Sequence, residues 1–130
     1  ETDVWTGRLI GLSEHQLTGP NDLVLLKIST RTAEDDFYVT FNRADGMNAE
    51  TQEGPDMVMV TMVPKKYKLD ERHFVSSKLM AKLHAGQEYQ SGPWMRFTSL
   101  VVAVDSIDTS VSPGVATITV YRCDALCQIR

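Results

Sequence analysis

The segment from Phe37 to Thr61 constrains the fold of this chain more than any other, because it predicts a strand, a long polar loop and a second strand. Apolar residues recur at every second position from Phe37 to Phe41, the period of a strand with one buried face. The run from Met57 to Val63 is apolar on both faces except at Thr61, which is typical of a strand inside a sheet. The two runs predict a β-rich core, with any site in the loop between them.

Further strand candidates are separated by clusters of Gly, Pro, Asn, Asp and Ser, the residues that form turns. The candidates are Val4 to Leu12, Leu23 to Ile28, Met95 to Ile107 and Val115 to Tyr121. The run from Leu23 to Ile28 is nearly all apolar, which predicts one short buried strand. About eight short strands with frequent turns are typical of an antiparallel β-sandwich, which we expect to be jelly-roll-like, with a closed barrel as the alternative.

Two later segments differ in pattern from these strand candidates. The residues from His73 to His84 fit both a helical stripe and an alternating strand. Because strands are expected before and after them, we expect a β-hairpin that turns at Ala85 and Gly86. The residues from Ser91 to Trp94 contain a Gly-Pro pair and are expected to form a loop.

The length and charge of the chain limit the class of protein. Its 130 residues are the length of one domain, and they suffice to bury a core without disulfides or metal. The net charge of −4 argues against nucleic acid as a partner, because nucleic-acid binders usually carry a basic face. No apolar run approaches the roughly 18 residues that predict a membrane span. The beginning, Glu1 to Trp5, has neither Met nor an apolar signal segment, so we expect a processed mature chain or an excised segment.

Cys123 and Cys127 are the only cysteines and are separated by three residues. In an extended strand their Cα atoms would lie roughly 13 Å apart, beyond the reach of a disulfide, whereas a turn would bring them within range. A local disulfide and free thiols therefore both remain open at this point. The lack of a second Cys pair argues against structural zinc. A disulfide, if formed, would indicate an oxidising compartment.

The loop between the first two strand runs carries oxygen-bearing side chains of the kind that calcium prefers. The candidate ligands are Asp45, Asn48, Glu50 and Asp56. Their spacing does not match an EF-hand, because Gly46 follows Asp45 directly. The alternative is a solvated loop in which Asn and Asp side chains cap turns. Calcium is the one cofactor that the sequence suggests.

Motifs that anchor a catalytic site are absent from the sequence. His15, His73 and His84 show neither the His-Glu-x-x-His spacing of zinc proteases nor a His-x-x-x-His spacing. No nucleophile elbow, P-loop or dinucleotide-binding glycine motif occurs. We therefore expect that the chain is not an enzyme.

Aromatic side chains are the candidates for ligand contact, because exposed rings can stack on sugars. Trp94 is the first candidate for ligand contact, because we expect it in a Gly-Pro loop, and Tyr67 and Tyr89 are further candidates. Tyr67 lies in the basic stretch Pro64 to Lys68, which suits phosphate, sulfated polysaccharide or an acidic protein surface. The alternatives are ordinary core aromatics and a solvated charged loop.

Three stretches resemble a known module. They are Phe37 to Thr61 with Phe41-Asn-Arg-Ala-Asp-Gly at its centre, Lys78 to Tyr89, and Val115 to Val120. This pattern resembles a β-module of secreted gametolysin-like, metalloprotease-related proteins of algae and diatoms. The resemblance implies an extracellular, non-catalytic β-domain that accompanies a protease, with Asn42 and Arg43 as module-defining residues. The zinc-binding motif of the protease is missing here, so the resemblance implies no protease activity for this chain.

Together these features predict a secreted, non-enzymatic binding or adhesion module, with carbohydrate as the favoured ligand. The expected partner is an extracellular polysaccharide or protein, with no nucleic acid and no membrane span. The alternative is a structural subunit of a larger assembly, because six methionines and the apolar run from Met57 to Val63 suit an adaptable interface.

Overall fold

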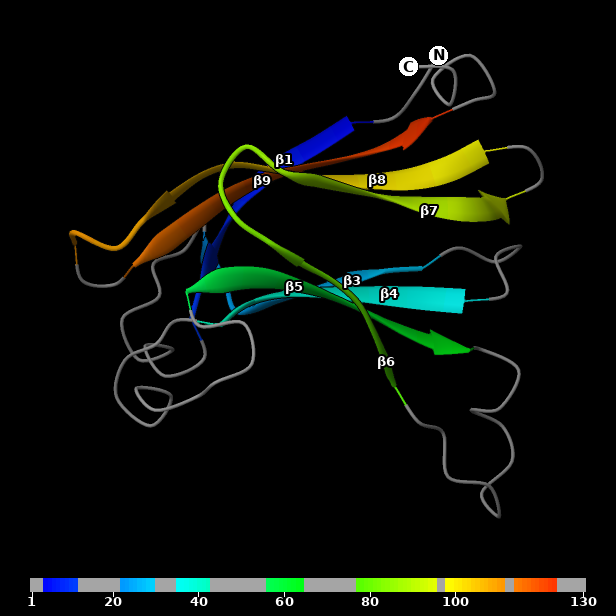
Figure 1. The fold of residues 1–130 in the computed structure, drawn as a ribbon, viewed down its shortest axis with the longest axis horizontal. Coiled ribbons are helices and arrows are strands. Elements are labelled where there is room, and N and C mark those ends of the chain that lie inside the picture. The colour runs from blue at the N-terminus through cyan, green and yellow to red at the C-terminus, as the bar shows by residue number, and fades with distance from the viewer. Residues whose placement is uncertain are drawn as a thin grey trace.

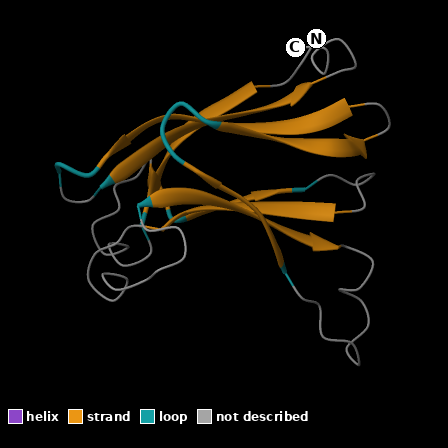
Figure 2. Cartoon of the chain, in the orientation of Figure 1, coloured by secondary structure: helices purple, strands orange, loops and turns teal. Residues whose placement is uncertain are grey.

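The computed structural model describes residues 4–11, 22–29, 35–42, 56–64, 77–95, 98–111 and 114–123, with the backbone alone for Asp22 and residues 93–95. These residues form nine strands and their connections, and they contain no helix (Figure 2). It follows that none of the described ranges holds a helix long and apolar enough to cross a membrane.

The strands form two sheets that lie one above the other (Figure 1). Sheet A has the order β2 (Asp22–Leu23), β1 (Val4–Ile10), β9 (Val115–Cys123), β8 (Thr98–Asp108) and β7 (Glu88–Met95). Sheet B has the order β3 (Leu25–Ile28), β4 (Asp35–Asn42), β5 (Met57–Pro64) and β6 (Lys78–Leu83). All pairings are antiparallel except the short parallel pair of β1 and β2. The predicted antiparallel β-sandwich is confirmed.

The connectivity is simpler than that of a jelly roll, which contains two Greek keys. In the described part of the chain, β3 to β6 follow one another across sheet B, and β7 to β9 do so across sheet A. Strand β1 then lies beside β9, so the first long strand and the last one are hydrogen-bonded neighbours. The two sheets keep separate edges instead of closing into one barrel.

The core fills the space between the sheets with alternate residues from each strand. In β4, Phe37, Val39 and Phe41 are at most 3% exposed, which confirms the period of two in the sequence. They meet Leu100, Val102 and Val104 of β8, which are at most 2% exposed. The full core cluster is Leu9, Phe37, Val39, Phe41, Val58, Val60, Leu83, Leu100, Val102, Val104, Ala116, Ile118 and Val120.

The apolar run from Leu23 to Ile28 is not one buried strand, as its composition predicts. The chain bends at Val24, so Leu23 pairs with Leu9 in sheet A while Leu25 already pairs with Thr40 in sheet B. Leu23 and Leu25 are 36% and 50% exposed. The run therefore carries the chain from one sheet to the other along the side of the sandwich, which periodicity within one segment does not reveal.

The predicted hairpin around Ala85 and Gly86 is also corrected. Both flanking strands exist, but β6 belongs to sheet B and β7 to sheet A, so the turn joins the two layers (Figure 1). Gln87 N–H donates to the His84 carbonyl at 3.1 Å, and Gly86 has a φ of 84°, as position three of a type II turn requires. The turn is fastened to β8, because Gly86 N–H donates to the Val104 carbonyl and Val104 N–H donates to the Gln87 carbonyl.

The predicted loop from Ser91 to Trp94 belongs to β7, although its pairing with β8 shifts register between Gln90 and Pro93 and again before Met95. Ser91 is 7% exposed. Its hydroxyl accepts a hydrogen bond from the Leu100 N–H at 2.8 Å and donates to the Gly92 carbonyl at 2.7 Å. The side chain thus supplies the acceptor that the irregular ladder does not, which explains how a Gly-Pro pair is tolerated in an edge strand.

Cys123, the last residue of β9, is 1% exposed and disulfide-bonded. The other cysteine of the chain, Cys127, lies outside the described residues. Of the two alternatives that the cysteine spacing leaves open, a disulfide and free thiols, the structure shows a disulfide at Cys123.

Candidate functional site

The outward side of sheet B gathers apolar, aromatic and basic side chains. Since Phe37, Val39 and Phe41 enter the core, the residues between them in β4 point the other way, and the same alternation holds along β3 and β5. We call this surface the sheet B face. It comprises Leu25, Lys27, Asp36, Tyr38, Thr40, Asn42, Met57, Met59, Thr61, Val63, Leu79 and Lys82. All of them are half-buried or exposed except Asp36.

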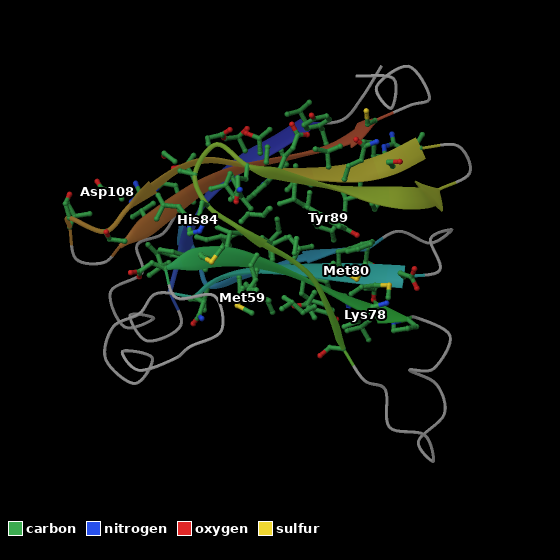
Figure 3. All side chains as sticks on the ribbon, in the orientation of Figure 1. Met59, Lys78, Met80, His84, Tyr89 and Asp108 are labelled. Atoms are coloured by element: carbon green, nitrogen blue, oxygen red, sulfur yellow. The ribbon has the colours of Figure 1, made fainter. Side chains whose placement is uncertain are left out.

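Strand register arranges the centre of the sheet B face in two neighbouring rows. One row runs through Lys27, Tyr38, Thr61 and Leu79. The other runs through Leu25, Thr40, Met59 and Lys82, with Met59 marked on β5 in Figure 3. A lysine therefore stands at one end of each row, on opposite edges of the sheet, with a tyrosine ring and two threonine hydroxyls between them.

Lys27 is oriented by its neighbours on β4. Its Nζ lies 3.9 Å from Oδ2 of Asp36 and 6.0 Å from the centre of the Tyr38 ring. The Lys27 side chain is 53% exposed, whereas that of Asp36 is 2% exposed. A loose ion pair and a cation–π contact thus hold the ammonium over the sheet without removing it from water.

The outward side of sheet A differs in chemistry. Thr119 Oγ1 donates to Oδ2 of Asp105 at 2.6 Å, and the same hydroxyl lies 3.2 Å from Oγ1 of Thr6. Asp105 stands where the pairing of β8 with β9 shifts register, between Val104 and Ser106. These hydroxyl and carboxylate groups bond to one another and so stabilise the sheet, and Arg8 is an exposed cation on the same side.

Tyr89 lies in the space between the two sheets (Figure 3). Its ring centre is 6.3 Å from that of Phe37, with the planes tilted by 48°. Burial, and secondarily the carboxylate of Asp35, raise the pKa of the Tyr89 hydroxyl above its usual value of 10.0. Packing against the core gives this aromatic residue a structural role, and its stacking on a sugar stays a prediction.

The other predicted aromatic contacts are only partly described. Trp94 has its backbone in β7 rather than in a loop, and its side chain lies outside the described residues. Tyr67 lies outside them altogether. The grouping of Trp94, Tyr67 and Tyr89 as one ligand site therefore stays a prediction.

Of the four predicted calcium ligands, only Asp56 is described. It precedes β5, is half-buried and has a φ of 52°, a left-handed conformation that Asp tolerates in turns. Asp45, Asn48 and Glu50 lie outside the described residues. Within the described ranges no three His, Cys, Asp or Glu side chains group closely enough to hold a metal ion. Calcium stays a prediction.

One exposed carboxylate has a shifted pKa. The hydroxyl and backbone N–H of Ser110 both donate to Oδ1 of Asp108, at 2.6 Å and 3.0 Å, and these bonds hold its pKa below 3.8. The bonds close the turn that follows β8, so this shift has a local structural cause.

The sequence alone does not identify the sheet B face, although it carries part of the signal. The alternation around Tyr38 and Thr40 indicates that they share one face of a strand. It does not indicate that Lys27 and Lys82 flank that face, because strand order and register depend on contacts far apart in the sequence.

Comparisons with known proteins add no relative to this description. No family model matches the chain, and searches of curated proteins and of solved structures found no match for it.

Proposed function

We propose that the chain is a non-enzymatic extracellular binding module, and that its sheet B face contacts a polysaccharide. The observation that carries the proposal is the row of Lys27, Tyr38 and Thr61 beside Thr40 on the outward side of one sheet. A tyrosine ring can stack on a sugar ring, threonine hydroxyls can exchange hydrogen bonds with sugar hydroxyls, and a rigid sheet keeps both in place.

The disulfide of Cys123 supports the extracellular part of the proposal, because disulfides persist in oxidising compartments. The resemblance of Phe37 to Thr61 to modules of secreted gametolysin-like proteins supports it independently. A calcium ion held by Asp45, Asn48, Glu50 and Asp56 is a separate part of the proposal. An ion that binds only the folded state stabilises that state, so EDTA should then lower the melting temperature. Identical melting curves with and without EDTA would contradict a bound calcium ion.

Binding to a panel of soluble extracellular and cell-wall polysaccharides tests the proposal, measured by affinity electrophoresis. Tyr38→Ala should weaken binding to the polysaccharide that retards the wild-type protein most. Tyr121→Ala is the matched control, because Tyr121 is also half-buried but pairs with Val4 and Val101 on the outward side of sheet A. Trp94→Ala, run in parallel, tests the residue predicted from the sequence. If no polysaccharide binds, or if both tyrosine variants behave alike, the assignment is wrong.

A second function, a structural subunit of a larger assembly, is favoured by one observation. Large exposed apolar side chains occur on β1, β2 and β3. They are Val4 at 62%, Leu25 at 50%, Trp5 at 37% and Leu23 at 36% exposure. Two pairs of such side chains, Val4 with Trp5 at the start of β1 and Leu23 with Leu25 beside its other end, can contact another protein. Light scattering after size exclusion tests self-assembly, and a strict monomer at high concentration excludes a homo-oligomer.

A further inference from the structure

We infer that the ligand of the sheet B face is an anionic polysaccharide, one that carries carboxylate or sulfate groups along its chain. The inference rests on the proposed function and names the chemical class of its ligand. It is carried by the charges of the sheet B face and by where the strand register places them.

The sheet B face is positive although the whole chain has a net charge of −4. Its exposed charged residues are Lys27 and Lys82. Its one acidic residue, Asp36, is 1% exposed and lies against Lys27. Among the described residues of this face, a polyanion therefore meets two accessible ammonium groups and no accessible carboxylate.

The two lysines are spaced for a polymer. Lys27 lies on β3 and Lys82 on β6, the two edges of sheet B, so three strand spacings of together about 14 Å separate them across the sheet. Tyr38, Thr40 and Thr61 lie between. A charged chain laid across the strands can pair with each ammonium group and contact the ring and hydroxyls in between.

Lys27 is also positioned before a ligand arrives. The contacts with Asp36 and Tyr38 restrict its side chain, so less conformational entropy is lost when a carboxylate or sulfate pairs with its ammonium group. A neutral polysaccharide uses neither charge, which is why the geometry favours the anionic class.

The experiment compares three probes by affinity electrophoresis: polygalacturonate, its methyl ester as the uncharged form of the same backbone, and dextran sulfate. Polygalacturonate and dextran sulfate should bind, more weakly as salt is added, while the methyl ester binds at least several-fold more weakly. Lys82→Gln should weaken polygalacturonate binding about threefold, the size expected for one exposed ion pair, and the Lys27→Gln, Lys82→Gln double variant about tenfold.

Lys78→Gln is the matched control, because Lys78 is an exposed lysine of the same strand but pairs with Met62, which packs on the core side. It should leave binding unchanged. Lys27→Arg keeps the charge beside buried Asp36 and should retain binding, which separates the role of the charge from any loss of folding in Lys27→Gln.

The possible failures are distinguishable. If the methyl ester binds as tightly as polygalacturonate, the anionic ligand is overturned while polysaccharide binding stands. If Lys78→Gln weakens binding as much as Lys82→Gln, the charges that bind are not specific to the sheet B face and the inference is overturned. If neither the three probes nor any polysaccharide of the wider panel binds, the proposed function fails together with this inference.

Discussion

The indole ring of Trp5 lies directly over Gly7, two residues further along β1. A methyl group on Gly7 would overlap Cη2 and Cζ2 of the indole. Both residues face the inner side of sheet A, where Trp5 shares a register row with Val120, Val102 and Tyr89. The glycine is therefore needed for space rather than for backbone freedom.

Gly7→Ala should displace the Trp5 ring into solvent. Since Trp5 is already 37% exposed, the ring can move, and we expect a stability loss of about 1 kcal/mol with a red-shifted emission of Trp5. Tryptophan fluorescence and urea unfolding, both in a Trp94→Phe background, measure the two effects. Gly92→Ala is the control, because, its neighbours in the chain aside, no atom of the described residues lies within 4 Å of a Cβ at this position. Equal behaviour of the two variants contradicts the prediction.

Ser91→Ala should destabilise the fold by about 1 to 3 kcal/mol, because the buried N–H of Leu100 loses its acceptor. Urea unfolding of Ser91→Ala and of Ser106→Ala, an exposed serine on β8, measures the difference. A loss at Ser91 no larger than that at Ser106 shows that water or backbone replaces the hydroxyl.

Stability should fall at alkaline pH in part because of Tyr89. Its pKa is raised in the folded state, so above the unfolded value of 10.0 the unfolded chain loses the proton first. The contribution is complete below pH 10.0 and is lost as pH rises through the folded pKa. Unfolding free energies of the wild type and of Tyr89→Phe, measured from neutral pH upward, should converge or cross as the phenol ionises. Parallel curves would show that Tyr89 titrates alike in both states.

The unreduced protein should contain no free thiol, because Cys123 is disulfide-bonded and the chain has two cysteines. Thiol titration in denaturant measures this directly. Reduction should lower stability by about 2 kcal/mol, a small value because the cysteines are separated by three residues and close a short loop. One or more reactive thiols in fresh, unreduced protein would contradict the assignment.

The sequence predicts individual strands better than their partners. Two strands are recognisable from pattern alone: apolar residues alternate from Phe37 to Phe41, and the run from Met57 to Val63 is apolar except at Thr61. Both strands lie inside sheet B. The longest strand candidate, Met95 to Ile107, corresponds to β8 with a shift at its beginning. Local pattern suffices here because burial of each face acts on every residue of the strand.

Apart from the predicted loop from Ser91 to Trp94, which belongs to β7, the failures concern relations between segments. Leu23 to Ile28 has the composition of one strand, yet it serves two sheets. Ala85 and Gly86 have the chemistry of a turn, but nothing near them encodes that the turn changes layer. The sheet B face cannot be predicted for the same reason, since Lys27 and Lys82 come to lie on one face only after four strands have paired.

The pairing of β1 with β9 has a mechanical consequence. The two strands are antiparallel, with Val4 opposite Tyr121 at one end and Ile10 opposite Val115 at the other. A force that pulls Val4 and Cys123 apart acts across the strands at that first pair, so the ladder opens one pair at a time, like a zipper. A sandwich loaded in this direction yields at low force, whereas the same contacts pulled along the strands would have to break together.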